Sequence, residues 1–489
     1  MKTLDYLLSV IDTKEIIGST DKPVTGIVTD SRRAGEGDLF VARVGAAVDS
    51  HQFIPAVVEA GVTAVIVERL PEFLESNVTY IVVSDSAVAL GFLASQWYDN
   101  PSRRLSLVGV TGTNGKTTTA TLLYNLTRRL GHRAGLLSTV ANYIDGEMVP
   151  ATHTTPDPMT LNALLARMAD AGCRYAFMEV SSHAAHQQRI AGLHFAGGIF
   201  TNLTRDHLDY HKTVAAYIAA KKSFFDLLPS SGWALVNADD RNGAVMVQNT
   251  MSRRYTYALR CDADFRCRVV ENRLDGMALE INGTQVETLF TGRFNAYNLT
   301  AVAAGAMLLG FDRDDVMVAL SCLTPVSGRF ETLRAKSGLT AIVDYAHTPD
   351  AVVNLLSTIR EVIGPDRQII TVIGAGGNRD DGKRPIMGAE AARLSDRVIL
   401  TSDNPRDEDP AMIINRMKEG ITDPARLAAT LAIVDRAEAI NTAIALAGAA
   451  DVVVVAGKGH ETYQEIAGER RHFDDREVIR ARFELLDNR

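Results

Sequence analysis

The sequence feature that most restricts the fold is a glycine-containing loop between an apolar segment and a helix. The loop reads GVTGTNGKT from Gly109 to Thr117, after an apolar stretch over 105–110. A helix is predicted over 117–130, and Gly131 stands at a position typical of a helix C-cap. Such a loop turns backbone N–H groups toward phosphate, and the helix N-terminus adds a favourable dipole. We therefore expect a parallel α/β sheet with a nucleotide at the carboxyl end of one strand.

The glycine spacing departs from the strict phosphate-loop pattern G-x-x-x-x-G-K-S/T, because Val110 stands at the first glycine position. The remaining residues keep the chemistry of the pattern. Gly112 and Gly115 supply flexible backbone, Lys116 can reach the β- and γ-phosphates, and the Thr117 hydroxyl can bind Mg²⁺. The alternative is an ordinary turn that contains a lysine, and the strand and helix on either side argue against it.

Predicted strands and helices alternate along three parts of the chain, which is the pattern of parallel sheets. We predict an α/β protein of three domains, with a central P-loop-type parallel sheet and a C-terminal doubly wound, Rossmann-like sheet. The predicted boundaries are 1–101, 102–331 and 332–489. An antiparallel addition is expected over 253–290. The predicted strands are 38–42, 64–67, 80–83, 105–110, 175–180, 198–200, 233–236, 340–343, 368–373, 397–400 and 451–455.

Composition restricts the partners and the compartment. The net charge of the 489 residues is -8, so a chain-wide basic surface for nucleic acid is missing. No apolar run has the length of a membrane helix, and the N-terminus lacks a signal-peptide layout. We expect a soluble, cytoplasmic protein without a membrane partner, and a monomer because no coiled coil is visible. The four cysteines form no CxxC pair and are expected to be buried thiols: Cys173, Cys261, Cys267 and Cys322.

Seven further motifs follow the loop in order. They are EVSSH (179–183), TNLTRDHLDYH (201–211), GRFNAYN (292–298), DYAHTPD (344–350), GGNRDDGKRPIMG (376–388), DNPR (403–406) and GKGHE (457–461). Together with the loop they resemble the Mur ligase family, which joins amino acids to the UDP-muramyl precursor of peptidoglycan and also has the first loop glycine displaced. The resemblance covers nearly the whole chain. It implies ATP and Mg²⁺, and an acyl phosphate that an amine then displaces.

The resemblance assigns the loop and several later residues to ATP. Asn295 and Asn298 resemble adenine contacts, and Arg329 is expected to reach ATP from a domain junction. Without the family, DYAHTPD reads as a strand followed by a helix that begins at a proline with Thr348 as its cap. The predicted ATP-binding residues are Gly112, Thr113, Asn114, Gly115, Lys116, Thr117, Thr118, Asn295, Asn298, Arg329 and Asp344.

The same resemblance implies Mg²⁺ ligands at Thr117, Glu179, His207 and Lys221, and catalytic roles for Lys116, His207 and Lys221. Oxygen and imidazole donors after strands suit a metal that bridges phosphates. A single glutamate or histidine is more often structural, and the positions of Glu179 and His207 in matched motifs favour the metal.

Lys221 is expected to be carbamylated, because the family carries such a lysine at this distance after HLDYH. The modification turns an ammonium into an anion and first needs a neutral amine, which partial burial favours. Two adjacent lysines usually indicate a solvated face. Counting from His211 selects Lys221 rather than Lys222.

Hydroxyl groups and an arginine resemble contacts to the UDP-muramyl-dipeptide, whose carboxylate and phosphate oxygens suit such donors. In the first domain, Ser31 resembles a contact to the uridine diphosphate, and the family's pyrophosphate turn is expected at 46–48. The predicted residues for this substrate are Thr29, Ser31, Ala46, Ala47, Val48, Thr154, Thr155, Ser181, Gln187 and Arg189.

DNPR resembles the recognition motif for meso-2,6-diaminopimelate. A guanidinium at Arg406 can bind the distal carboxylate through two parallel hydrogen bonds, whereas lysine presents an ammonium there. Taken alone, the stretch reads as an Asn-Pro turn with an exposed arginine. Arg379 and Glu461 resemble contacts to a carboxylate and an amine. The predicted residues for this amino acid are Arg379, Asp403, Asn404, Pro405, Arg406, Gly457 and Glu461.

The expected reaction is the ATP-dependent addition of meso-diaminopimelate to the D-glutamate γ-carboxylate of UDP-N-acetylmuramoyl-L-alanyl-D-glutamate. Rival hypotheses are a lysine-adding ligase, the ligase that adds the terminal dipeptide, and a folylpolyglutamate synthetase. DNPR argues against the first two, and the N-terminal part of about a hundred residues argues against the third. A P-loop regulatory switch is an alternative from another class, and it would hydrolyse ATP slowly without a carboxylate substrate.

Overall fold

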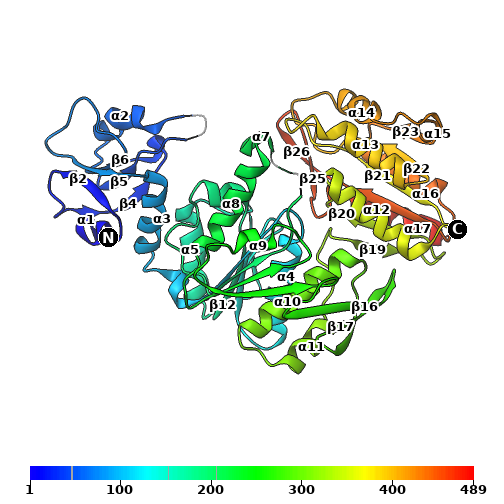
Figure 1. Cartoon of the computed structure of the whole chain (residues 1–489). Helices are drawn as coiled ribbons and strands as arrows, with labels where there is room; N and C mark the ends of the chain where they lie inside the picture. Colours follow the sequence, from blue (N-terminus) through cyan, green and yellow to red (C-terminus); the bar gives the residue numbers. More distant parts are fainter. Residues whose placement is uncertain (46–47, 152–153, 205, 207, 489) are drawn as a thin grey trace.

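The computed structural model describes residues 1–45, 48–151, 154–204, 206 and 208–488. Three sheets, each with its own hydrophobic core, form three lobes that follow one another along the chain (Figure 1). The predicted α/β class with three units is confirmed, and the boundaries at 101 and 331 stay a prediction.

The N-terminal lobe is built on a five-stranded sheet in the order β2-β7-β6-β5-β4, parallel except for β2 at one edge. Helix α3 of this lobe packs on α5 of the central lobe. Gly91 of α3 permits a second close approach, to the turn after α6, because a Cβ there would lie 2.6 Å from the carbonyl oxygen of Ala191. The elements are β1 (Lys2–Thr3), α1 (Leu4–Leu8), β2 (Thr13–Ile17), β3 (Pro23–Val24), β4 (Gly26–Val28), β5 (Asp38–Val41), α2 (Ile54–Glu59), β6 (Ala64–Val67), β7 (Thr79–Val83) and α3 (Ser86–Trp97).

The central lobe contains an eleven-stranded sheet in the order β11-β10-β9-β12-β8-β13-β14-β15-β16-β17-β18. Strands β9 to β16 of this order pair in parallel, and antiparallel strands close both edges. The antiparallel addition expected over 253–290 therefore continues the main sheet. The strands are β8 (Ser106–Thr111), β9 (Ala134–Leu137), β10 (Asn142–Ile144), β11 (Glu147–Val149), β12 (Tyr175–Glu179), β13 (Gly197–Phe200), β14 (Trp233–Asn237), β15 (Arg253–Ala258), β16 (Phe265–Arg273), β17 (Gly276–Ile281) and β18 (Thr284–Thr288).

Helices cover both faces of the central sheet. Val108 and Val110 of β8 face α4 and α10, whereas Leu107 faces α5 and α8, as the two-residue period of a strand requires. This sandwich fixes the carboxyl end of β8, where the glycine loop begins. The helices are α4 (Lys116–Arg129), α5 (Pro158–Asp170), α6 (Ser182–His186), α7 (Leu208–His211), α8 (Val214–Asp226), α9 (Gly243–Met246), α10 (Arg293–Leu308) and α11 (Arg313–Ser321).

The C-terminal lobe has a six-stranded sheet in the order β19-β20-β24-β21-β22-β23, parallel except for β19. Helices α12 and α13 lie on one face and α16 and α17 on the other, which is the predicted doubly wound arrangement. The predicted cap of α12 is confirmed, since the Thr348 side chain accepts a hydrogen bond from the backbone N–H of Ala351.

The elements of this lobe are β19 (Glu331–Arg334), β20 (Thr340–Asp344), α12 (Pro349–Ile363), β21 (Ile369–Ile373), α13 (Lys383–Leu394), β22 (Arg397–Leu400), α14 (Pro410–Lys418), α15 (Pro424–Ala428), β23 (Thr430–Ala432), α16 (Arg436–Leu446), β24 (Val452–Ala456), β25 (Tyr463–Ile466), β26 (Glu469–His472) and α17 (Asp475–Asp487). Strands β25 and β26 form a separate hairpin after the GKGHE motif.

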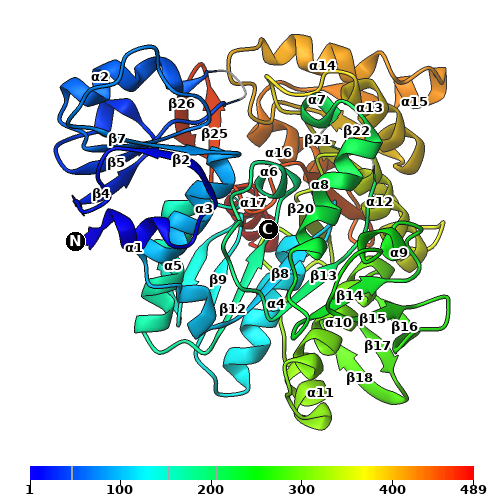
Figure 2. The same cartoon turned by 60° about the vertical axis from the view of Figure 1, so that its left-hand side comes forward.

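The segment between the central and C-terminal lobes is packed against the GKGHE loop. Gly328 has a φ of +67°, and a Cβ there would collide with the backbone of Gly459 and His460. A second view shows the C-terminal lobe above the central sheet, with the N-terminal lobe to one side (Figure 2). The segment around Gly328 therefore joins the central and C-terminal lobes beside the GKGHE loop.

The expectation that all four cysteines are buried is wrong for two of them. Cys173 and Cys267 are buried, but Cys261 and Cys322 are exposed, and all four thiols are free. Cys261 lies in the turn after β15, where its backbone N–H binds Asp239, and Cys322 is the C-cap of α11. Thiols are among the most buried side chains on average, but a turn or helix end overrides that tendency.

Among the described residues, none of the helices combines the length and the apolar character that crossing a bilayer requires.

Candidate active site

One cavity of about 770 Å³ lies between the central and C-terminal lobes. The carboxyl ends of β8, β12 and β13 reach it from the central sheet, and those of β20, β21, β22 and β24 reach it from the C-terminal sheet. Ligands of parallel α/β sheets bind at this end of the strands. The predicted ATP residues from Thr113 to Thr118 line the cavity, and so do the predicted amino-acid residues Asp403, Asn404, Arg406 and Glu461.

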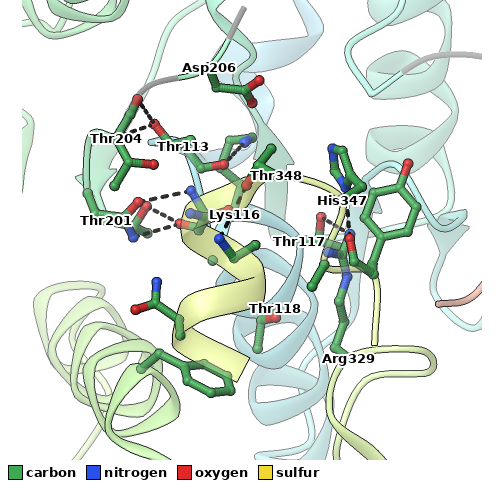
Figure 3. A pocket seen from close by; sticks show the side chains of 18 of the residues that line it. Thr113, Lys116, Thr117, Thr118, Thr201, Thr204, Asp206, Arg329, His347 and Thr348 are labelled. Carbon is green, nitrogen blue, oxygen red and sulfur yellow. Dashed lines mark hydrogen bonds between the residues drawn. The ribbon is translucent and has the colours of Figure 1, made fainter. Parts of the chain in front are cut away.

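The glycine loop is held by the chain that follows β13. The backbone N–H of Asn114 donates to Asn202 Oδ1 at 2.9 Å, and Thr201 Oγ1 donates to the carbonyl of Asn114 at 2.6 Å. Thr113 Oγ1 lies 3.1 Å from the hydroxyl of Tyr217 on α8. Figure 3 shows Thr113, Thr201 and Thr204 gathered on one side of Lys116. The loop is thus set in its phosphate-binding conformation by neighbouring strands, and Lys116 begins α4 directly after it.

Oxygen donors suitable for Mg²⁺ meet where α4 begins. Thr117 Oγ1 donates to Glu179 Oε2 at 3.0 Å, and Glu179, the last residue of β12, is 1% exposed. Glu179 Oε1 accepts from the backbone N–H of Thr139 at 2.7 Å. A hydroxyl and a buried carboxylate beside a phosphate loop are the ligands that Mg²⁺ prefers. The donor set therefore fits the ion. The predicted ligand His207 lies outside the described residues.

Two lysines converge on a single carbonyl oxygen of the loop. Lys116 Nζ donates to the carbonyl of Gly112 at 3.0 Å, and Lys221 Nζ donates to the same oxygen at 2.7 Å. Lys221 is 1% exposed, and burial, with Lys116 adding to it, holds the pKa of the Lys221 amine well below its usual range. Lys222 instead ion-pairs with Asp226 at 2.7 Å. Of the two adjacent lysines, Lys221 is the one beside the loop and the one whose pKa burial lowers, which favours the uncharged amine.

Arg329 connects the C-terminal lobe to the loop. Its Nη2 donates to Thr117 Oγ1 at 3.3 Å, and its guanidinium lies 4.4 Å from the ring centroid of Tyr345 (Figure 3). Burial raises the pKa of Asp344, although Arg329 opposes that shift, and Asp344 accepts from the backbone N–H of Phe330 at 2.7 Å. The predicted ATP residues Arg329 and Asp344 therefore stand together at the entry of the C-terminal lobe.

Asn295 and Asn298 lie on α10 and line the cavity below the loop. Asn298 Nδ2 donates to Asn295 Oδ1 at 3.3 Å, and a Cβ on Gly115 would lie 2.5 Å from Asn298 Oδ1. The two amides thus stand against the back of the glycine loop. Their adenine contact stays a prediction.

The residues predicted for the muramyl peptide are gathered around Thr155. Its hydroxyl donates to the carbonyl of Glu179 at 2.8 Å, and its own carbonyl accepts from Arg189 Nη1 at 2.7 Å. Arg189 also donates to Gln187 Oε1 at 2.7 Å, while Ser181 caps α6. Thr154 and Ser181 line the cavity, whereas Thr155, Gln187 and Arg189 lie behind it.

The residues predicted for uridine diphosphate lie on the N-terminal lobe, and none of the described ones lines the cavity between the other two lobes. Thr29 is exposed, Ser31 is half-buried at the start of a short helical turn, and Val48 is 51% exposed. Ala46 and Ala47 lie outside the described residues. The structure therefore does not bring the described members of this set together with the phosphate loop.

The predicted amino-acid pocket is formed by three loops that follow β21, β22 and β24. Arg406 has a φ of +54°, and its Nη1 donates to the carbonyl of Gly377 at 2.6 Å. The hairpin β25–β26 fixes its backbone, since Arg406 N–H donates to the carbonyl of Glu465 at 3.0 Å and Ala467 N–H donates to the carbonyl of Arg406 at 2.7 Å. Arg379 is exposed at the cavity, and Pro405 lies behind the lining.

Several residues that shape this pocket carry no role in the sequence prediction. Gln464 Nε2 donates to the carbonyl of Asp403 at 2.8 Å. Arg384 forms two hydrogen bonds of 2.8 Å with Glu408 below the GGNRD loop. Lys458 is fully buried and contacts Asn404 and Glu461. Lys458 and Arg384 lie inside motifs that the sequence analysis identified, so the motifs could have pointed to both residues. Their contacts, however, are made with loops that are distant in sequence.

A phosphate loop, a pair of lysines beside it and a charged second pocket in the same cavity define a nucleotide-dependent enzyme that brings a further substrate to the phosphates. Three family models match the chain: "Mur ligase family, catalytic domain" over 23–98, "Mur ligase middle domain" over 110–306, and "Mur ligase, glutamate ligase domain" over 328–459.

Relatives match over nearly the whole length. A protein of Parabacteroides distasonis named UDP-N-acetylmuramoyl-L-alanyl-D-glutamate--2,6-diaminopimelate ligase is 57% identical over 477 residues, covering 98% of each chain. A protein of Cytophaga hutchinsonii with the same name is 53% identical, covering 100% of this chain and 99% of its own. A solved structure under that name is 32% identical, with a TM-score of 0.70 and 99% of each chain covered. The chain therefore belongs to the Mur ligase family.

The half-buried histidine of DYAHTPD, His347, should make stability depend on pH. Burial, with Lys383 adding to it, lowers the pKa of His347 to about 4, and its Nδ1 lies 2.7 Å from the carbonyl of Tyr345. An unfolded histidine titrates near 6.5, so the unfolded chain binds more protons between about pH 6.5 and 4. The stability that neutral His347 contributes is complete above that window and is lost as the pH falls through it, by about 3 kcal/mol.

We expect His347→Gln to lose less stability than the wild type between pH 7 and pH 4.5. Urea unfolding at both pH values measures the difference, and His194→Gln, outside the cavity, serves as the control. Equal pH dependence of the wild type and His347→Gln would contradict this assignment.

Proposed function

We propose that the chain is an ATP-dependent ligase that adds meso-2,6-diaminopimelate to the D-glutamate γ-carboxylate of UDP-N-acetylmuramoyl-L-alanyl-D-glutamate, in peptidoglycan synthesis. The observation that carries the proposal is the single cavity in which the phosphate loop of one lobe faces the Arg406 pocket of another. The names of relatives that are 53% to 57% identical over nearly the full length support the same reaction.

The first half-reaction transfers the γ-phosphoryl group of ATP. An oxygen of the γ-carboxylate attacks the γ-phosphorus of ATP, and the bond from that phosphorus to the β–γ bridging oxygen breaks. ADP is released, and the substrate carboxylate becomes an acyl phosphate. Such transfers depend on positioning and on charge neutralisation. The loop N–H groups and Lys116 hold the phosphates, and Arg329 adds a positive charge from the segment between the central and C-terminal lobes, 3.3 Å from Thr117. Thr154 and Ser181, which line the same cavity, are proposed to orient the carboxylate.

The second half-reaction forms the amide. An uncharged amine of diaminopimelate attacks the acyl carbon, the carbon–oxygen bond to phosphate breaks, and phosphate leaves while the nitrogen gives up a proton. Arg406 and Arg379 are proposed to bind carboxylates of the amino acid, and Glu461 and Asp403 to bind its amines. These contacts would hold the amine next to the acyl phosphate, and this proximity would accelerate amide formation.

Thr117 and Glu179 are the described residues that would hold Mg²⁺, with His207 and a carbamylated Lys221 as further proposed ligands. Bound there, the ion would neutralise phosphate charge. The carbamate forms when the neutral Lys221 amine adds to CO₂ and loses a proton, and it converts a surplus cation beside Lys116 into an anion. The low pKa of the Lys221 amine supports this step, because only an uncharged amine adds to CO₂.

The N-terminal lobe is proposed to bind the uridine diphosphate end through Thr29, Ser31 and the turn at 46–48. The three lobes then correspond to domains 1–101, 102–331 and 332–489. We place the reaction in the cytoplasm, where ATP is available, and propose a monomer.

Phosphate release tests the reaction directly. We expect the purified chain to release phosphate from ATP only when the UDP-muramyl-dipeptide and meso-diaminopimelate are both present, because each half-reaction needs its own acceptor. The product, an amide heavier by one diaminopimelate residue, is identified by mass spectrometry. Equal phosphate release without the dipeptide would instead indicate a nucleotide switch.

Arg406 should set the choice of amino acid. We expect Arg406→Ala to lower kcat/KM for diaminopimelate by about 10³-fold or more, because the distal carboxylate loses its partner. The rate with lysine, which has no such carboxylate, should change far less. Arg393→Ala, a surface arginine paired with Glu390, is the control. An unchanged preference between the two amino acids would remove Arg406 from this role.

Carbamylation of Lys221 should be visible by NMR. We expect protein incubated with ¹³C-bicarbonate to show a carbamate signal that is missing from Lys221→Met and present in Lys222→Met. Activity should fall in CO₂-depleted buffer and return with bicarbonate, since the carbamate is in equilibrium with CO₂. A signal that persists in Lys221→Met would contradict the assignment.

A further inference from the structure

Lys458 is a fully buried cation inside the predicted amino-acid pocket. Its side chain is 0% exposed, and Nζ donates to Asn404 Oδ1 at 3.0 Å and to Glu461 Oε2 at 3.1 Å. The ring centroid of Tyr463 lies 5.5 Å from the same nitrogen. Burying an ammonium is costly unless it is paired and hydrogen-bonded, so these contacts are what hold Lys458 in place.

The network fixes the orientation of the Asn404 amide. Asn404 Oδ1 accepts from Lys458 Nζ and from the backbone N–H of Glu465 at 2.9 Å, while Nδ2 donates to Glu461 Oε2 at 2.7 Å. A flipped amide would set its N–H groups against two donors and its oxygen against a carboxylate. Asn404 lines the cavity, so it can offer a ligand its remaining N–H but no acceptor.

The same network leaves one carboxylate oxygen of Glu461 available. Oε2 receives hydrogen bonds from both Lys458 and Asn404, whereas Oε1 has no hydrogen-bond partner among the described residues. Glu461 lines the cavity with a side chain that is 15% exposed. Its free oxygen is thus an anionic acceptor suited to an ammonium group or an amine.

A second buried cation in this lobe shows what a purely structural pair looks like. Arg436 forms two hydrogen bonds with Asp475, at 2.7 and 2.8 Å, and both side chains are 0% exposed. Neither residue lines the cavity. The partners of Lys458 differ, because both of them line the cavity.

We propose that Lys458 is a positioning residue for the amino-acid substrate: it orients Asn404 so that its N–H donor faces a carboxylate group of the substrate, and Glu461 so that its anionic acceptor faces an ammonium group. The inference rests on the proposed function and deepens it. Lys458 itself does not touch the substrate, since its side chain is closed off from the cavity.

The test compares Lys458→Met with the wild type. Methionine has nearly the shape of lysine, so a packing role alone would be tolerated. We expect KM for diaminopimelate to rise about 10- to 100-fold, as hydrogen bonds to charged groups would predict, with KM for ATP unchanged and kcat changed less than KM. Lys458→Gln keeps a donor without the charge and should give an intermediate KM. Lys336→Met, an exposed lysine of the same lobe, is the control.

A double variant separates positioning from folding. In Lys458→Met/Glu461→Gln the unpaired carboxylate is gone, so we expect Tm to return toward that of the wild type while KM for diaminopimelate stays raised. An unchanged KM in Lys458→Met, an equal rise of KM for every substrate, or recovery of KM together with Tm would each overturn the proposal.

Calorimetric binding of diaminopimelate, with ADP present, keeps the test independent of turnover. If the wild type binds the amino acid in this assay but forms no amide in the phosphate-release assay, the proposed function fails, and weaker binding to Lys458→Met still supports the positioning role. If the wild type and Lys458→Met bind equally, or neither binds, the positioning role is overturned.

Discussion

The backbone turn from Gly112 to Gly115 is the constraint on which the rest of the site depends. Both glycines have positive φ, +149° and +87°, and a side chain on Gly112 would collide with Thr201. Asn202 and Thr201 hold the loop from the next strand, and Asn298 stands against Gly115. The loop can therefore take this shape only because neighbouring elements are placed around it, and its N–H groups are organised before any phosphate binds.

The charges around the loop follow from that turn. The Gly112 carbonyl accepts from both Lys116 and Lys221, so two amines of like charge are drawn toward one oxygen. Burial lowers the pKa of both amines. Lys116 adds to that shift at Lys221, and Arg329 adds to it at Lys116, where Glu179 partly offsets it. Phosphate groups bound at the loop would favour the charged form of Lys116. A second ammonium at Lys221 would add to the positive charge beside Lys116, whereas the proposed carbamate would replace it with a negative charge.

Much of the fold was predictable because its signals are local. The strand, glycine loop and helix around Lys116, the cap at Thr348 and the strand end at Glu179 all depend on residues close together in sequence. The continuity of the eleven-stranded sheet could not be predicted in this way, because no local sequence pattern indicates that β14, β15 and β16 pair with one another. The exposure of Cys261 and Cys322 likewise depends on turns rather than on residue type.

The amino-acid pocket shows the same division between residue identity and placement. The DNPR motif alone suggests a guanidinium that recognises a carboxylate, but not where that guanidinium points. The structure fixes it through a left-handed backbone at Arg406, two backbone hydrogen bonds to the β25–β26 hairpin and one side-chain bond to Gly377. Without these restraints, the Arg406 side chain would be free to move toward the carboxylate of Glu465, whose Oε2 lies 4.0 Å from Arg406 Nε.

In the proposed role of Arg406, selectivity would depend on the hairpin as much as on the guanidinium. A guanidinium restrained at its backbone and at Nη1 cannot withdraw from a ligand that presents an ammonium, so a mismatched amino acid would meet a like charge. A mobile arginine would relieve that penalty by turning away and would accept either ligand. The hairpin residues lie about 60 positions after the motif in the chain, and only folding brings the two together.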